Sequence, residues 1–158
     1  RCQRERSKIS GRTQEIQRLI GRSLRSCVDL EKMTGLTLTI DADVIQADGG
    51  TRCASICGGY LVLEDAVNKL MAQGKLAQNP ILEPIAAVSI GLIDGEVKLD
   101  LDYSEASHAQ VDSNVVMTKS GKIIEFQTTA EGNPFTKQEL YQILETAENA
   151  IQKIIGMY

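Results

Sequence analysis

The sequence predicts the α+β fold class, a mixed β-sheet with helices packed on it, and three local patterns support this class. Apolar residues recur at helical spacing near the N-terminus. A nine-residue apolar run, Ile85–Ile93, precedes the hairpin dipeptide Asp94-Gly95. Thr136 and Glu139 have the spacing of a capping box ahead of another periodic apolar stretch. With 158 residues and no repeat or obvious linker, the chain predicts one domain over residues 1–158.

The first half of the chain predicts two helices with a strand between them. Helical spacing indicates an amphipathic helix over residues 14–33, and Gly35 is a plausible stop. Strict alternation of apolar and polar residues predicts a half-buried strand over residues 36–44. A turn at 46–51 then leads into a second helix over residues 52–73.

The second half predicts strands and a final helix. After the buried strand Ile85–Ile93, the hairpin returns along residues 97–103, and a loop follows at 104–111. Two further strands are expected at 113–118 and 122–128. The last helix begins after Thr136.

The charge is distributed unevenly. The net charge is −4, yet the first 25 residues carry +6 and the remaining residues −10. Seven of the eight arginines lie in those first 25 positions. Because the guanidinium fork matches phosphate well, this block is a candidate polyanion site, with nucleic acid the first choice. A solvated basic helix face explains the charge alone equally well.

Several classes of site are excluded. His108 is the one histidine, so a multi-histidine metal site is absent, and the four cysteines form no C-x-x-C pair. Sparse cysteine predicts a reducing, cytoplasmic setting. The longest apolar run, nine residues, is far shorter than the roughly 20 that span a bilayer, so no membrane association is expected.

The turn at 47–52, Ala-Asp-Gly-Gly-Thr-Arg, is a candidate phosphate site. Paired glycines allow close backbone approach to an anion, and the following helix offers free N–H groups. Arg52 opposes the helix dipole there, which suggests a functional reason for its position. Arg12 stands at the start of the first helix, so the two arginines could converge on one phosphate. A tight turn that uses its glycines for geometry alone remains the alternative.

Four carboxylates, with a loop histidine before the last of them, form the other candidate site. Clustered oxygen ligands suit Mg²⁺ or Mn²⁺, although a solvated strand face and loop is the simpler interpretation. His108, in the same loop, is expected to be a bystander, and Cys53 and Cys57 to be core residues. The carboxylates are Asp100, Asp102, Glu105 and Asp112.

Six segments, in order, closely resemble bacterial ribonuclease PH. They lie at 11–25, 41–52, 86–91, 99–103, 111–117 and 129–135, and the resemblance extends over nearly the whole chain. The resemblance implies a phosphate-dependent 3′→5′ exoribonuclease, a nucleotidyltransferase that trims the 3′ ends of tRNA precursors and other RNA and releases nucleoside diphosphates. Inorganic phosphate would be the co-substrate and Mg²⁺ the metal ion.

The resemblance also assigns residues. It implies phosphate binding by Arg12, Gly50, Thr51 and Arg52, and a catalytic and metal-binding role for Asp112. It implies that residues 1–11 form a basic loop that contacts RNA through Arg1, Arg4 and Arg6.

Three departures from the family pattern stand out. The family's Glu-Asp reads Glu105-Ala106, so a carboxylate six residues before Asp112 is lost, and activity is expected to fall unless Glu105 or Asp102 compensates. Thr128 replaces a family glycine. Family members also begin some 70 residues earlier, with strands expected to complete the sheet.

The resemblance further implies a ring-shaped homo-hexamer, a trimer of dimers. A second hypothesis, based on Ala106, is a catalytically silent RNA-binding subunit of such a ring.

Overall fold

The computed structural model describes residues 9–158, which form four helices, one short 3₁₀ helix and one four-stranded sheet. All three strand pairs are antiparallel, in the order β2-β1-β3-β4. The elements are α1 (Gly11–Ser26), η1 (Leu30–Met33), α2 (Thr51–Ala72), β1 (Ile85–Ile93), β2 (Glu96–Leu99), α3 (Tyr103–His108), β3 (Val111–Thr118), β4 (Ile123–Ala130) and α4 (Lys137–Ile155).

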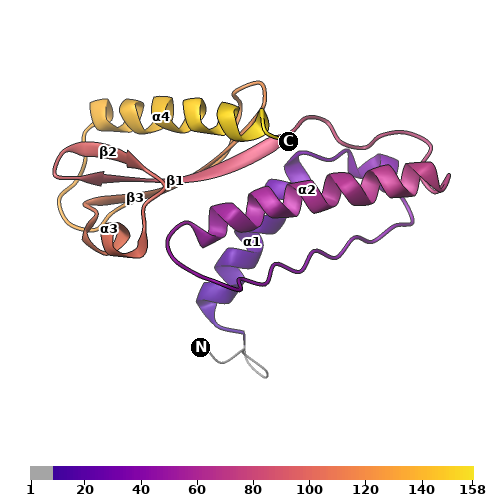
Figure 1. Ribbon diagram of the computed structural model, residues 1–158, viewed down its shortest axis with the longest axis horizontal. Helices are drawn as coiled ribbons and strands as arrows, with labels where there is room; N and C mark the ends of the chain where they lie inside the picture. The colour runs from indigo at the N-terminus through magenta and orange to yellow at the C-terminus, as the bar shows by residue number, and fades with distance from the viewer. Residues whose placement is uncertain (1–8) are drawn as a thin grey trace.

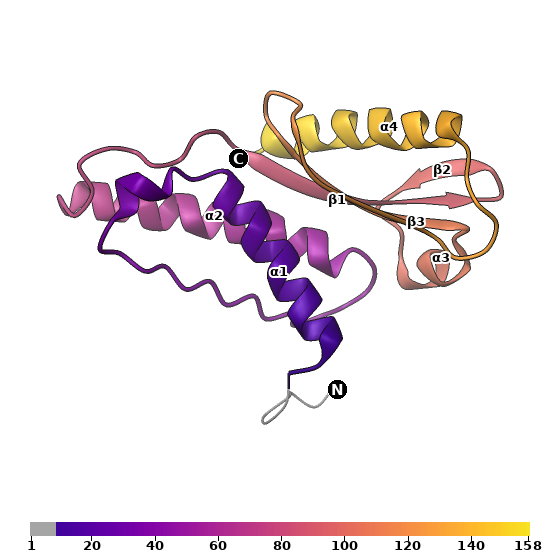
Figure 2. The same ribbon diagram turned by 180° about the vertical axis from the view of Figure 1, so that it is seen from behind.

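The sheet lies between two helical layers. Helix α4 lies along one side of the sheet, and α1 and α2 lie on the other (Figures 1 and 2). This arrangement confirms the predicted α+β class. Within residues 9–158, no helix combines the length and the apolar character needed to span a bilayer.

Each face of the sheet has its own apolar cluster. Alternate β1 residues point to opposite faces, so Ala86 and Val88 pack with α4 while Ile85 and Ala87 pack with α1 and α2. Cys57 packs against both clusters. The prediction that Cys53 and Cys57 are core residues is confirmed, because Cys53 is buried and Cys57 half-buried.

The first helix is shorter at its C-terminal end than predicted. It ends at Ser26 because Val28 forms a β-bridge with Ile81 and the Asp29 N–H donates to the Pro80 carbonyl at 2.8 Å. The Asp29 side chain then caps η1. These long-range contacts replace the helical hydrogen bonds that local spacing predicted for residues 27–33.

The predicted strand over residues 36–44 is wrong, although part of its pattern is correct. Leu36, Leu38 and Ile40 are half-buried and pack against the cluster beneath α1 and α2. The backbone of residues 37–42 forms no hydrogen bond with any other described residue, so there is no β-ladder. The alternation of apolar and polar residues therefore predicted which side chains face inward. It could not predict whether a neighbouring strand exists.

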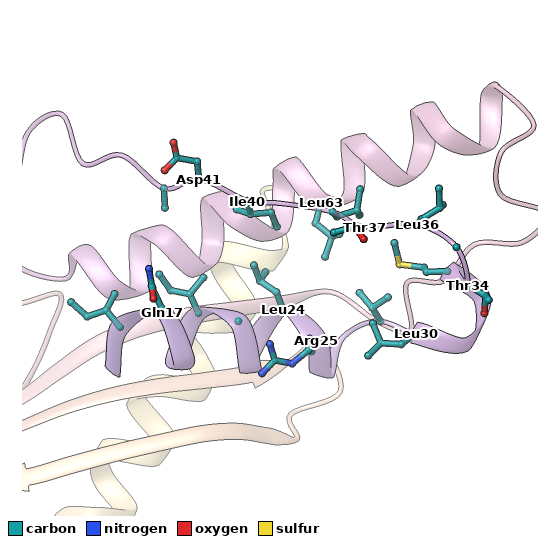
Figure 3. A pocket seen from close by; sticks show the side chains of 18 of the residues that line it. Gln17, Leu24, Arg25, Leu30, Thr34, Leu36, Thr37, Ile40, Asp41 and Leu63 are labelled. Carbon is teal, nitrogen blue, oxygen red and sulfur yellow. The ribbon is translucent and has the colours of Figure 1, made fainter. Parts of the chain in front are cut away.

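An apolar groove of about 940 Å³ lies beside this segment. Figure 3 shows Leu24 of α1, Leu63 of α2 and Ile40 of the segment around it. This groove is chemically unlike the candidate phosphate turn, because most of its lining side chains are aliphatic. Neither Arg52 nor Asp112 lines it.

The returning hairpin strand ends early. The turn itself is confirmed, since Asp94 (φ 51°) and Gly95 (φ 80°) both have the positive φ of a type I′ turn. Strand β2 stops at Leu99 because Asp100 adopts a left-handed conformation (φ 57°). The residues that follow form α3, where a loop was expected, because Asp102 and Glu105 make a reciprocal capping box.

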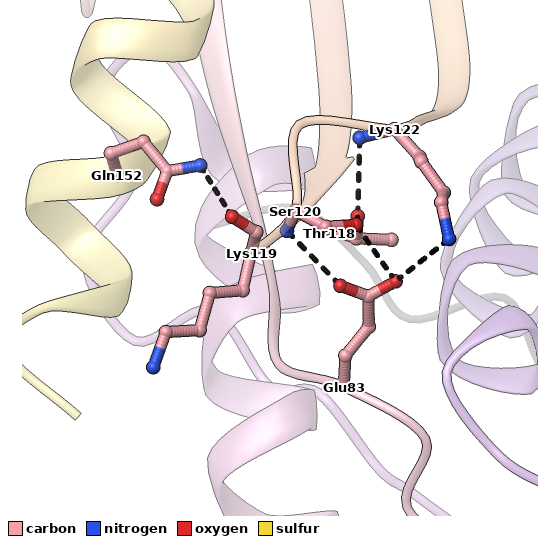
Figure 4. A network of polar contacts seen from close by, with 6 residues as sticks. All are labelled: Glu83, Thr118, Lys119, Ser120, Lys122 and Gln152. Atoms are coloured by element: carbon pink, nitrogen blue, oxygen red, sulfur yellow. Dashed lines mark hydrogen bonds and ion pairs between the residues drawn. The ribbon is translucent and has the colours of Figure 1, made fainter.

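The turn between β3 and β4 is held by a polar network. The Glu83 carboxylate accepts hydrogen bonds from the Ser120 N–H (3.0 Å) and hydroxyl (3.2 Å). Gln152 of α4 donates to the Lys119 carbonyl at 2.9 Å (Figure 4). The network ties this turn to the segment entering β1 and to α4, so it fixes the end of the sheet that is distant from Asp112.

Candidate functional site

The N-terminus of α2 leaves its first amides without a side-chain cap. Gly50 is the N-cap residue in a left-handed conformation (φ 67°, ψ 12°), and no side chain caps the helix. The first turn contains no acidic residue. Uncapped N–H groups and the positive end of the helix dipole together favour an anion.

The backbone of Gly49 lies directly against the loop after β2. A Cβ on Gly49 would lie 1.7 Å from the Leu101 carbonyl oxygen, so any side chain is excluded. The Asp48 carboxylate accepts a hydrogen bond from the Tyr103 N–H at 2.7 Å. The position of a Gly50 Cβ would be 3.3 Å from Oδ1 of Asp100, so that carboxylate borders the turn. These contacts bring the glycine turn and the acidic loop together.

Arg52 lies in the first turn of α2 and contacts α1. Its Nη2 atom is 3.1 Å from Oε2 of Glu15. Glu15 is one helical turn after Arg12 on α1, so Arg52 contacts the same helix that carries Arg12. Sequence analysis did not single out Glu15. Its spacing from Arg12 was the available signal, but the contact with Arg52 depends on how α1 and α2 pack.

Asp112 lies on the face of the sheet that α2 covers. Sγ of Cys53, the residue after Arg52, donates to Oδ1 of Asn114 at 3.3 Å. Asn114 follows Asp112 by two positions in β3, so both side chains share that face. Charge coupling between Arg52 and Asp112 agrees with this placement.

The charge environment of Asp112 is mixed. Burial raises the pKa of the Asp112 carboxyl above its ordinary value, and the negative charge of Glu131 acts in the same direction. The guanidinium of Arg52 opposes this rise in pKa. Burial, with smaller contributions from Cys57 and Asp112, raises the pKa of the Cys53 thiol to about 12, so Cys53 is a neutral core residue.

The neighbouring carboxylates, Asp102 and Glu105, form hydrogen bonds and an ion pair at the start of α3. Oδ1 of Asp102 accepts from the Glu105 N–H at 2.7 Å, and Glu105 Oε1 is 3.1 Å from Nζ of Lys98. Ala106 is half-buried in the same helix, and its N–H donates to the Asp102 carbonyl. Asp102 and Glu105 are therefore both engaged in local contacts of α3 and β2.

The described residues contain no group of three or more His, Cys, Asp or Glu side chains that could hold a metal ion. Mg²⁺ is commonly bound through one or two carboxylates together with substrate phosphates and water. Asp112 fits the role of one such carboxylate, beside a turn suited to phosphate.

Thr128 and His108 form contacts with neither Arg52 nor Asp112. The Thr128 hydroxyl is 2.8 Å from that of Ser113, on the same face as Phe126, which packs towards α4. Thr128 therefore lies on the opposite face of the sheet from Asp112. His108 ends α3, where its Nδ1 is 2.8 Å from the Ser104 carbonyl oxygen. Of the other predicted residues, Arg1, Arg4 and Arg6, with most of the predicted loop 1–11, lie outside the described residues.

Solved structures share this fold. The chain superposes on Rrp46 from rice with a TM-score of 0.63 and 18% identity, over 94% of this chain and 64% of that chain. It superposes on a chain of the Archaeoglobus fulgidus exosome, solved with RNA bound to the active site, with a TM-score of 0.68 and 15% identity, over 95% of this chain and 63% of that chain. These likenesses define an exosome-subunit-like α+β fold.

Sequence comparison then gives the family. Residues 1–68 match the model of the 3′ exoribonuclease family, domain 1, and residues 83–150 match domain 2 of the same family. The chain belongs to the 3′ exoribonuclease family, which confirms the resemblance drawn from its motifs.

Two relatives carry the name ribonuclease PH. The protein of Crocosphaera subtropica is 55% identical over 157 residues, 99% of this chain, and that of a Synechococcus species is 54% identical over 155 residues, 98% of this chain. The chain spans 65% and 63% of the lengths of these relatives.

The close approach at Gly49 gives a stability prediction. Gly49→Ala should lower the free energy of unfolding by about 1–3 kcal/mol, because the new methyl group cannot fit beside the Leu101 carbonyl. Gly58→Ala is the matched control, since a Cβ there meets nothing within 4 Å. Because Gly58 lies within α2, its replacement should stabilise by up to about 1 kcal/mol. Urea unfolding measures both, and equal effects at the two positions would contradict the close contact.

The buried carboxyl gives a pH prediction. Because the pKa of Asp112 is raised in the folded state, the free energy of unfolding falls as the pH rises from the ordinary carboxyl pKa through the raised folded-state pKa. Asp112→Asn should therefore unfold at higher urea concentration than the unsubstituted chain at pH 7. The gain should vanish below the ordinary carboxyl pKa, where both states are protonated. Glu145→Gln, at an exposed position of α4, provides the comparison. A gain that persists at low pH would show that Asp112 ionisation is not its cause.

Proposed function

We propose that this chain performs phosphate-dependent 3′→5′ exoribonuclease chemistry, releasing nucleoside diphosphates from RNA 3′ ends. The observation that carries the proposal is the meeting of three features at one place. They are the uncapped N-terminus of α2, the guanidinium of Arg52 and the half-buried carboxyl of Asp112. The identity to proteins named ribonuclease PH supports the same assignment.

The phosphate-binding part of the site is the α2 turn. Gly50 lets the backbone approach an anion, the Thr51 hydroxyl and the first α2 amides donate hydrogen bonds, and Arg52 supplies a fixed positive charge. Arg12, one turn before Glu15 on α1, is the second cation. Holding inorganic phosphate here overcomes its repulsion from the RNA backbone and makes the encounter with the terminal phosphodiester effectively intramolecular.

The proposed reaction forms one bond to phosphorus and breaks another. An oxygen of inorganic phosphate forms a bond to the phosphorus of the last phosphodiester, and the bond from that phosphorus to the 3′ oxygen of the preceding nucleotide breaks. The leaving 3′ oxygen takes up a proton, and the last nucleotide departs as a nucleoside diphosphate. Asp112 is the candidate group for this proton transfer, because its half-buried carboxyl lies close enough to interact with the charge of Arg52.

Asp112 is also the residue that would hold Mg²⁺, and the bound ion supplies charge neutralisation at the phosphoryl oxygens. Ala106 removes a second carboxylate from this part of the site. The proposal therefore expects a weakened metal site and a slow reaction.

The finer assignments follow the family. The substrates proposed are tRNA precursors and other RNA with unpaired 3′ ends, contacted by Arg1, Arg4 and Arg6. The assembly proposed is a homo-hexameric ring, a trimer of dimers, in the cytoplasm. The preference for RNA is supported by the basic α1, where Arg18 and Arg22 line a pocket of about 300 Å³ that reaches Gln127 of β4.

The test measures nucleoside diphosphates released from a tRNA precursor with an unpaired 3′ end, with Mg²⁺, with and without inorganic phosphate. Release should require phosphate. Arg52→Ala should reduce it on the order of hundredfold, because a fixed charge at the transferring phosphoryl group is lost. Ala106→Asp should increase it roughly tenfold or more by restoring a carboxylate near Asp112. Lys153→Ala, at an exposed position of α4 across the sheet, should change nothing.

Phosphate-independent release, or full activity of Arg52→Ala, would contradict the proposal. RNA binding without release by the chain and by Ala106→Asp would point instead to the catalytically silent subunit.

A further inference from the structure

The carboxylate of Glu15 forms an ion pair with Arg52 at the place where phosphate is proposed to bind. Oε2 of Glu15 lies 3.1 Å from Nη2 of Arg52, and the contact joins the second turn of α1 to the first turn of α2. Arg12 is three residues before Glu15 on the same helix. Glu15 therefore places a negative charge directly on Arg52, one of the two arginines assigned to phosphate.

The contact is suited to exchange. The Glu15 side chain is 41% exposed and that of Arg52 26% exposed, so the carboxylate can turn into solvent without crossing packed side chains. The contact joins one guanidinium nitrogen to one carboxylate oxygen. Phosphate presents more oxygens and can use the guanidinium fork together with the free amides of α2. An exposed ion pair of this kind is weak, so phosphate can displace it.

We propose that Glu15 is an internal competitor of inorganic phosphate, which holds Arg52 when phosphate is absent and is displaced when phosphate binds. The inference rests on the proposed function, and it makes Glu15 a positioning residue that acts through Arg52. In the phosphate-free chain, Glu15 keeps the guanidinium at the α1–α2 junction and balances its charge beside the uncapped helix terminus. The affinity for phosphate then depends on the difference in free energy between the contact of Arg52 with phosphate and its contact with Glu15.

The experiment measures the Kd of inorganic phosphate for the full chain by calorimetry in a phosphate-free, low-salt buffer. Glu15→Gln should lower this Kd by about two- to fivefold, the range expected when a competing exposed ion pair is removed. A variant that merely damaged the site would raise the Kd, so a gain of affinity is specific to competition. Glu145→Gln makes the same change at an exposed α4 position across the sheet and should leave the Kd unchanged.

A second variant separates displacement from simple charge repulsion. Glu15→Asp keeps the negative charge but shortens the side chain by one methylene, so it cannot make the same 3.1 Å contact with Arg52. If displacement sets the affinity, Glu15→Asp should bind phosphate more tightly than the unsubstituted chain. If Glu15→Asp binds like the unsubstituted chain while Glu15→Gln binds more tightly, repulsion alone acts, and the proposal is wrong.

The remaining outcomes are distinguishable from failure of the proposed function. An unchanged or higher Kd in Glu15→Gln would overturn the competitor role and leave phosphorolysis standing. Tighter phosphate binding by the variants without nucleoside diphosphate release would support the role of Glu15 and remove the proposed activity. Absence of phosphate binding in every variant, Glu15→Gln included, would overturn both.

Discussion

The backbone of Gly49 lies so near the Leu101 carbonyl that no side chain fits between them, and this approach determines where α2 starts. Asp48 reinforces it through the Tyr103 N–H. With the turn held there, Gly50 adopts its left-handed conformation and the first amides of α2 point into the site. Arg52 can then contact Glu15 on one side and act on Asp112 on the other. One backbone contact thus aligns groups from α1, α2 and β3.

The helix that begins at this contact is unlike the others in the described part of the chain. Ser10, Asp102 and Thr136 cap α1, α3 and α4 with their side chains, whereas α2, the longest helix, has no side-chain cap. Arg52 in its first turn is also unfavourable to the helix dipole. Both features reduce the stability of the isolated helix end, and both favour an anion. A site that binds phosphate explains the two together, and Glu15 provides a negative charge at this end when the ligand is absent.

Features with local causes were predicted most directly from the sequence. The Asp94-Gly95 turn and the Thr136–Glu139 capping box each depend on a few adjacent residues, and both are confirmed. The strand at 36–44 failed because pairing needs a neighbour, which alternation does not encode. In the site, Arg52 and Asp112 were named from motifs. Their approach depends on the register of β3, and the contact between Glu15 and Arg52 depends on helix packing. No local sequence pattern encodes the distance from Arg52 to Asp112 or from Glu15 to Arg52.

The site has two parts that depend on different contacts. The proposed phosphate-binding part rests on the turn at Gly49 and Gly50, where the residues that the resemblance assigns to phosphate are present. The proposed proton and metal part has Asp112, whereas Ala106 stands where the resemblance implies a second carboxylate. Asp102 and Glu105 cannot move to replace it without breaking the capping box that forms α3. The proposal therefore expects phosphate binding at the turn to tolerate Ala106, because Ala106 lies in α3 whereas Arg52 lies in α2 and contacts α1.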